Sequence, residues 1–194
     1  MSLLAKLREE SNAAHRQLEE QVAITERIRD VDSYRELLQK FLGFYAPLEN
    51  RLEKLAGWAD WGYDPITRRK TAWLSQDLSA LGGDPGDIVS LPLCDDAPFP
   101  ESVAAGFGCA YVLEGATLGG RQITSWLEQS AIPKHARRFF ASYGENVGHQ
   151  WKGFCEALEY FGRSRKEHDE IIESASHTFS SLGRWLGPRA EAAL

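Results

Sequence analysis

The sequence predicts an all-α fold in a single domain, and three observations lead to that prediction. Apolar residues recur at steps of three and four along most of the 194-residue chain, which is the period of an amphipathic helix. No segment shows convincing alternation of apolar and polar residues, the pattern of a half-buried strand. A chain of this length is long enough to bury a core without disulfide or metal support. We therefore expect a single domain over residues 1–194, built as a bundle of seven helices.

The first two helices are predicted from capping residues and apolar faces. The first is expected to run from Ser2, its N-cap, to Val22, with apolar side chains along one face. The second is expected to start at Ser33, because Ser33 and Glu36 have the spacing of a capping box. Pro47 lies inside the apolar run of this second helix and predicts a kink.

The rest of the chain is divided by a segment rich in glycine and proline. Before it, the pair Asp64-Pro65 is expected to start a third helix, because proline fits the first helical position after a cap. Residues 82–100 cannot propagate a helix and are expected to form one long loop within the same domain. The four remaining helices are expected at residues 102–128, 133–143, 149–161 and 164–186. Ser164 and Glu167 have a capping-box spacing at the start of the last one.

Net charge, cysteine count and hydropathy exclude several classes of function. With a formal net charge of −6, the chain is not expected to bind nucleic acid. Cys94, Cys109 and Cys155 are widely spaced, which argues against a disulfide framework and against a cysteine zinc site. No apolar run approaches the roughly 20 residues of a membrane helix, and the N-terminal residues turn polar too early for a signal peptide. We therefore expect a cytoplasmic protein without a membrane partner.

Five glycines lie within the helix predicted at residues 102–128. They are Gly106, Gly108, Gly115, Gly119 and Gly120. Each helical glycine costs about 0.8–1 kcal/mol relative to alanine, a large cost for a domain whose whole stability is about 5–15 kcal/mol. Gly115 and Gly119 are four residues apart and share one helix face. Two interpretations stay open: a neighbouring helix packs closely on the glycines, or a flat ligand lies against them.

His15 is the second candidate site residue. It lies beside the apolar face of the first helix, and Glu19 follows four residues later on the same face. A carboxylate at this spacing can hold the imidazole nitrogen that a metal ion does not use, which fixes the histidine tautomer. A single histidine on a helix is more often a surface or core residue, so the metal-ligand interpretation needs a partner site.

Three groups of residues carry a specific combination of motifs. They are AAHRQLE at residues 13–19, YVLEGATLGG at residues 111–120, and the C-terminal pair WKGF at 151–154 and ASHTF at 175–179. In this order and spacing, the chain resembles the haem oxygenases, especially the compact bacterial branch associated with bacteriophytochromes. The first motif is similar to that family's segment around the axial histidine, and the second to its distal-helix motif.

The resemblance implies a haem sandwiched between the first helix and the helix of residues 102–128. His15 would be the axial ligand of the iron, with Glu19 as the partner of its other ring nitrogen. The distal, catalytic face of the haem would be formed by Gly115, Gly119 and Gly120. The candidates for holding the haem propionates or lining the pocket are Arg8, Tyr111, Lys152 and Phe179.

The resemblance also implies a reaction. Haem would be both substrate and cofactor, and O2 together with electrons would cleave it at a meso carbon to biliverdin, ferrous iron and carbon monoxide. The external electron donor would be a ferredoxin, a flavoprotein reductase or ascorbate, and a bacteriophytochrome would receive the biliverdin.

Two positions depart from the animal-type members of this family. Ala116 stands where those members carry an aspartate, and Glu156 falls near the place of a second cation for the propionates. The distal water network and the meso carbon that is attacked therefore cannot be transferred from that branch. The alternatives are a non-catalytic haem carrier on the same fold, a non-haem member of the wider fold superfamily, and a purely structural helical module.

Overall fold

The computed structural model describes residues 2–164 and 167–187. Its α-helices are α1 (Leu3–Val22), α2 (Ile24–Arg27), α3 (Val31–Lys54), α4 (Thr71–Ala80), α5 (Pro85–Val89), α6 (Val103–Leu127), α7 (Arg138–Ala141), α8 (Val147–Ser164) and α9 (His168–Leu186). Short 3₁₀ helices lie at Trp58–Trp61, Lys134–Ala136 and Gly144–Asn146. No strand occurs in the described residues, and the all-α prediction is confirmed.

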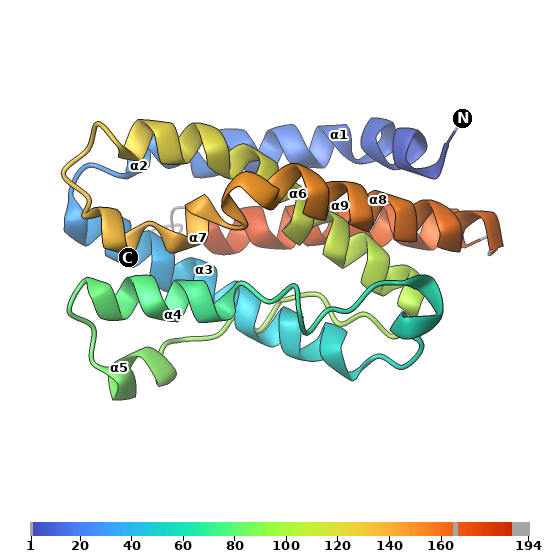
Figure 1. Ribbon diagram of the computed structural model, residues 1–194, viewed down its shortest axis with the longest axis horizontal. Helices are drawn as coiled ribbons and strands as arrows, with labels where there is room; N and C mark the ends of the chain where they lie inside the picture. Colours follow the sequence, from blue (N-terminus) through green and yellow to red (C-terminus); the bar gives the residue numbers. More distant parts are fainter. Residues whose placement is uncertain (1, 165–166, 188–194) are drawn as a thin grey trace, which may run out of the picture.

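Helix α9 is the common base of the bundle. In Figure 1, α1, α4, α8 and α9 run approximately along the longest axis of the molecule, and α6 crosses obliquely. Both α1 and α6 pack along α9, and α8 packs against both of them. On the other side of the molecule, α3 packs on α4 and α9. Two helices that are far apart in the sequence, α1 and α6, are thus held on one support.

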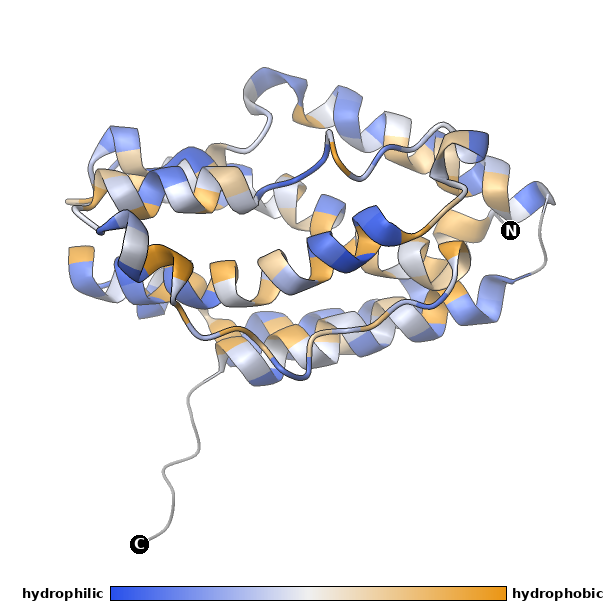
Figure 2. Ribbon diagram, turned by 90° about the horizontal axis from the view of Figure 1, so that it is seen from below, coloured by the Kyte–Doolittle hydropathy of each residue, from blue (hydrophilic) through white to orange (hydrophobic). Residues whose placement is uncertain are grey.

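The core is formed by the apolar faces of these helices. Figure 2 shows hydrophobic and hydrophilic residues alternating along each long helix, as expected for amphipathic elements. The largest fully buried aromatic side chains come from α3, α6 and α8. They are Tyr34, Phe44, Tyr45, Phe107 and Phe154. None of the helices described combines the length and the apolar character that a bilayer span requires.

The predicted starts of α1 and α6 are confirmed, because both caps are local. The Ser2 hydroxyl accepts a hydrogen bond from the backbone N–H of Ala5 at 3.2 Å. The Ser102 hydroxyl accepts one from Ala105 at 3.0 Å. The two helices that carry the candidate site residues therefore begin where their capping residues predict.

Helix α3 starts earlier than predicted. Its N-cap is Asp30, whose carboxylate accepts from the backbone N–H of Ser33 at 2.7 Å. The Ser33 hydroxyl in turn accepts from the Asp30 N–H at 3.0 Å. Ser33 is thus the third helical residue of a capping box and not its cap, so the predicted pairing with Glu36 was wrong. Pro47 lies inside α3, as expected.

The prediction that Asp64-Pro65 starts a helix was also wrong. The Asp64 carboxylate accepts from the N–H of Ile66 at 3.0 Å and forms a turn. Helix α4 begins only at Thr71, whose backbone N–H donates to the carboxylate of Glu49 at 3.2 Å. Because this cap comes from the middle of α3, the local sequence does not reveal it.

The segment of residues 82–100 contains a short helix, which corrects the prediction of a continuous loop. Asp84 caps α5, and its carboxylate accepts from the N–H of Gly86 at 2.8 Å. Pro85 occupies the first helical position. An aspartate cap followed by proline therefore starts a helix at this place. The sequence prediction missed it because glycines surround the pair.

The helix expected at residues 133–143 is broken into a 3₁₀ turn and α7. Asp77 of α4 accepts hydrogen bonds from the backbone N–H groups of Arg138 and Phe139, both at 2.8 Å. The carboxylate of Asp77 thus caps the N-terminus of α7, so that a separate helix begins at Arg138. Helix α7 ends at Ala141, and the next residue, Ser142, has φ 52° and ψ −124°.

The boundary between the last two helices also differs from the prediction. Ser164 is the final residue of α8, and its hydroxyl donates to the Tyr160 carbonyl at 3.0 Å. Helix α9 begins at His168, and Glu167 precedes it without a side-chain cap. The predicted end at Leu186 is confirmed.

Candidate functional site

His15 lies on the exposed side of α1, one helical turn before Glu19. Its Nδ1 is 3.7 Å from the Glu19 carboxylate, and its side chain is 47% exposed. An imidazole whose Nδ1 faces a carboxylate keeps its Nε2 as the nitrogen that can bind a metal ion. The spacing that made these two residues a candidate pair in the sequence therefore brings them together in the fold.

Phe179 of α9 connects the two helices that carry the predicted site. Its ring meets that of His15 edge to face, with centroids 5.2 Å apart. On its other side it meets Tyr111 of α6, at 6.2 Å and an interplanar angle of 90°. Tyr111 also contacts Trp151 of α8 at 5.9 Å. Phe179 thus contacts both helices that carry the predicted site residues, α1 and α6.

Three of the five glycines of α6 are explained by close packing. A Cβ on Gly106 would lie 2.7 Å from the Trp58 ring, and one on Gly120 would lie 2.6 Å from the carbonyl oxygen of Phe140. A Cβ on Gly108 would overlap the backbone of Ile171 in α9. For these positions the interpretation as a helix-packing surface is correct. Gly120 is accordingly buried against α7.

Gly115 and Gly119 are different, because no neighbour requires them to be glycine. A Cβ on Gly115 would meet only Trp151, at an ordinary distance of 3.9 Å, and one on Gly119 would meet no described atom within 4 Å. Gly119 is exposed, and Leu118 beside it is 38% exposed. These two glycines leave the backbone of one α6 face accessible, as the ligand interpretation requires.

The two predicted cations lie on the surface. Lys152 forms an ion pair with Glu156 at 3.7 Å, and both side chains are more than two-thirds exposed (75% and 68%). Arg8 is exposed on α1 and lies near Cys155 of α8. Burial raises the pKa of the Cys155 thiol to about 11, and the positive charge of Arg8 offsets part of that rise. In these contacts, neither Lys152 nor Arg8 is paired with a buried side chain.

A buried ionic cluster next to Gly115 was missed by the sequence analysis. The Glu114 carboxylate, 1% exposed, accepts hydrogen bonds from Lys70 Nζ at 2.5 Å and from Arg68 Nη1 at 3.2 Å. The Tyr143 hydroxyl donates to the same carboxylate at 3.2 Å. The available signal was an acidic residue in an otherwise apolar part of a predicted helix, since buried charges require partners.

The charge state of this cluster follows from its geometry. Burial lowers the pKa of Lys70, but Glu114, Tyr143 and Glu49 together outweigh this effect, and the pKa lies above its ordinary value. Lys70 is therefore positively charged at neutral pH. With Arg68 beside it, the cluster holds two cations and one carboxylate immediately behind the accessible face of α6.

The chain matches known proteins over nearly its whole length. The model of the Heme oxygenase family matches residues 1–187. A heme oxygenase of Xanthomonas campestris pv. campestris (strain 8004) is 31% identical over 166 residues, which cover 83% of this chain and 93% of that protein.

Two solved structures share the fold at 18% sequence identity. The heme oxygenase of Neisseria meningitidis was solved with bound NO and CO and matches with a TM-score of 0.81. The match covers 99% of this chain and 96% of the Neisseria chain. The heme oxygenase of Leptospira interrogans matches with a TM-score of 0.74. This match covers 96% of this chain and 98% of the Leptospira chain. With the whole-chain family match and the Xanthomonas relative, these findings show that the chain belongs to the haem oxygenase family, the enzymes that degrade haem to biliverdin.

Proposed function

We propose that this chain binds haem between α1 and α6, above Phe179, and cleaves it there to biliverdin, ferrous iron and carbon monoxide. One observation carries the proposal. The exposed His15 of α1 and the unobstructed glycines of α6 belong to helices that share α9 as their base. Phe179 contacts the first helix at His15 and the second at Tyr111, which supports a site that uses both.

His15 is proposed as the axial ligand of the haem iron. Its Nε2 is the nitrogen for the metal, because Glu19 lies 3.7 Å from Nδ1. The carboxylate orients the ring and favours the tautomer with the proton on Nδ1. Phe179 restricts rotation of the imidazole from the other side by its edge-to-face contact.

The α6 segment is proposed to cover the opposite face of the haem. Gly115 and Gly119 fit this group, since a side chain at either position would occupy the space that a flat macrocycle needs. Gly120 contributes indirectly: its close contact with the Phe140 carbonyl fixes α6 against α7. Haem, when bound, supplies the iron at which O2 is activated.

Surface cations and an aromatic hydroxyl are proposed to hold the propionates. Arg8 is exposed on α1, and Lys152 is exposed on α8, where its ion pair with Glu156 is screened by solvent. Tyr111 lies between Phe179 and Trp151 and is half-buried, and its hydroxyl is the proposed hydrogen-bond donor.

The proposed reaction also needs partners outside this chain. O2 and an external electron donor are required; a ferredoxin, a flavoprotein reductase or ascorbate would supply the electrons. A bacteriophytochrome is the proposed recipient of biliverdin. This last assignment rests on the branch that the sequence resembles.

The proposal is tested by following haemin absorbance through binding and turnover. Haemin is titrated into the protein, the complex is reduced without oxygen, and O2 is then added with ascorbate or a ferredoxin system. We expect a one-to-one complex with a Soret band that decays into the spectrum of biliverdin. Chromatography of the product then identifies the meso carbon that was cleaved.

Two other results would contradict the proposal in different ways. A Soret band that persists with every electron donor would indicate a haem carrier on this fold. Absence of a Soret band would remove His15 as an axial ligand and would indicate a non-haem member of the superfamily.

A further inference from the structure

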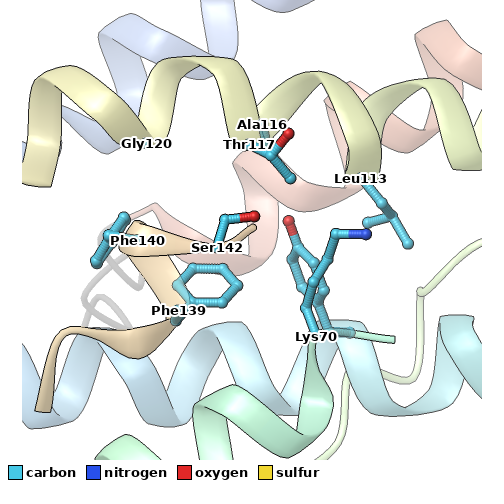
Figure 3. Close-up of a pocket in the computed structure, with 9 residues that line it drawn as sticks. Lys70, Leu113, Ala116, Thr117, Gly120, Phe139, Phe140 and Ser142 are labelled. Carbon is cyan, nitrogen blue, oxygen red and sulfur yellow. The ribbon is translucent and has the colours of Figure 1, made fainter. Parts of the chain in front are cut away.

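The two long sides of α6 offer very different amounts of space. Figure 3 shows the side turned toward α3, α4 and α7, where Leu113 and Thr117 face Lys70. The hollow on this side has a volume of about 20 Å³. Sites for small ligands and cofactors have volumes of roughly 300 Å³ or more. A macrocycle therefore has to use the opposite side of α6.

The opposite side of α6 is closed at one end and open at the other. Tyr111, Gly115 and Gly119 follow each other at steps of four residues and share this side. Trp151 of α8 contacts the Tyr111 ring at a centroid distance of 5.9 Å, and it would lie 3.9 Å from a Cβ on Gly115. One turn later, a Cβ on Gly119 would meet no described atom within 4 Å. The indole of Trp151 therefore forms a wall that ends between Gly115 and Gly119.

The core holds this wall in place. The Trp151 indole stacks on Phe154, with ring centroids 5.5 Å apart and planes at 30°, and Phe154 is fully buried. Phe154 in turn contacts the rings of Tyr63 and Phe107. Trp151 itself is half-buried, so part of its surface stays accessible. An aromatic side chain that is already fixed loses little conformational entropy when a ligand packs against it.

Haem presents chemically different edges to such a wall. One edge carries two propionates, and the opposite edge carries methyl and vinyl groups. An apolar ring favours the methyl and vinyl groups, because a carboxylate pressed against it would lose hydration without gaining a partner. The exposed Arg8 and Lys152 remain the proposed partners of the propionates.

We propose that Trp151 is a specificity-determining residue of the haem site. Its ring accepts a methyl or vinyl edge of haem, excludes the propionate edge, and thereby selects the meso carbon that is cleaved. Each quarter turn of haem in its own plane brings a different meso carbon to the open end at Gly119. Orientations that drive a propionate against Trp151 are disfavoured, so the orientations are unequally populated. This inference rests on the proposed function, because it concerns how haem is oriented between α1 and α6.

Three variants separate the wall from the stability of the fold. Trp151→Ala removes the wall, whereas Trp151→Phe keeps an aromatic ring next to Phe154. Trp61→Ala is the matched control, because Trp61 is also half-buried and packs on the same helix at Tyr160. Tyr160 lies nine residues beyond Trp151, which is roughly 13 Å along α8.

The first measurement is the proton NMR spectrum of the equilibrated ferric haem complex with cyanide, which reports the orientation of haem without turnover. Each orientation gives its own set of haem methyl signals. We expect one dominant set in the wild type and in Trp61→Ala, and a second set of comparable intensity in Trp151→Ala. If the alanine variant does not fold, Trp151→Phe decides the test, and it should show an increased second set. Identical spectra of the wild type and the folded Trp151 variants would overturn the proposal.

The second measurement is the isomer composition of biliverdin after a single turnover, separated by chromatography. The ratio of the main isomer to the others should fall about tenfold in Trp151→Ala and stay at the wild-type value in Trp61→Ala. A lower rate with an unchanged isomer ratio would show that Trp151 only supports the fold, and would overturn the proposal. An equal change in Trp61→Ala would overturn it as well.

Failure of the proposed function is recognised separately. If the wild-type protein binds no haem, the proposed function fails and the role of Trp151 fails with it. If the wild-type protein binds haem without degrading it, only the proposed reaction fails. The NMR spectra then decide whether Trp151 orients the bound haem.

Discussion

His15 and Phe179 meet edge to face, with ring centroids 5.2 Å apart and planes at 74°. The contact joins the first helix of the chain to the last described one, since α1 packs along α9. It places an imidazole with an available Nε2 at the edge of an aromatic base whose other neighbour is Tyr111 of α6. We propose that this contact helps to hold the His15 imidazole as the axial ligand of the haem iron.

Replacing His15 tests the proximal ligand. In His15→Ala, we expect the Soret spectrum of an axially ligated haem and nearly all turnover to disappear, while the unfolding midpoint stays near that of wild type because the side chain is 47% exposed. The measurements are a haemin titration and a urea unfolding curve. His135→Ala is the control, as His135 is exposed on a different element. Wild-type-like ligation in His15→Ala would contradict the assignment.

Two glycine substitutions on α6 are expected to have opposite effects. Gly115→Leu introduces a side chain on the accessible face, where only Trp151 lies near, so the fold should persist and gain up to about 1 kcal/mol from helix propensity. Haem binding or its oxygen binding should be obstructed. Gly120→Ala would place a Cβ 2.6 Å from the Phe140 carbonyl oxygen and should destabilise the fold by about 1–3 kcal/mol.

Thermal unfolding and haemin affinity distinguish these two outcomes. Gly115→Leu should combine a wild-type or higher Tm with impaired formation of the oxygen complex. Gly120→Ala should show a lower Tm. Unimpaired oxygen binding in Gly115→Leu would show that haem does not lie against this face of α6.

Removing the charge of Glu114 tests the buried ionic cluster. Glu114→Gln removes the carboxylate that pairs with both Lys70 and Arg68, and a broken buried pair costs about 3–5 kcal/mol. We expect a loss of this size in urea unfolding. Glu156→Gln is the matched control, since its pair with Lys152 is mostly exposed and should contribute less than about 1 kcal/mol. Equal effects of the two substitutions would rule out a special role of the cluster.

The buried tyrosines predict a loss of stability at alkaline pH. Burial raises the pKa of Tyr34, Tyr45 and Tyr63 far above the ordinary 10.0. Below pH 10 these groups are neutral in both states and contribute no pH dependence. Above pH 10 the unfolded chain releases their protons and the folded chain does not, so stability falls as pH rises, by up to about 1.4 kcal/mol per unit for each tyrosine.

Urea unfolding between pH 8 and 11 measures this effect. Tyr45→Phe should flatten the decline above pH 10, because Tyr45 is 1% exposed. Tyr160→Phe should leave the decline unchanged, because Tyr160 is 49% exposed. A pH dependence that Tyr45→Phe does not alter would show that other groups cause the alkaline unfolding.

The starts of α1 and α6 and the pair His15–Glu19 could be predicted from local patterns in the chain. Ser2 and Ser102 cap α1 and α6 through hydrogen bonds to residues only three positions away, and His15 and Glu19 are one turn apart on the same helix. Interactions of this range depend on the local chain alone, so that spacing and residue type were sufficient to predict them.

Which glycines pack closely and which stay accessible depends on how the helices are arranged in space. The five glycines of α6 look alike in the sequence, but a Cβ on Gly120 would meet the Phe140 carbonyl, whereas one on Gly119 would meet no described atom within 4 Å. The starts of α4 and α7 were likewise undecided, since Glu49 and Asp77 cap them from 22 and 61 residues away. Such contacts exist only after helices distant in the sequence have packed together, and no local pattern encodes them.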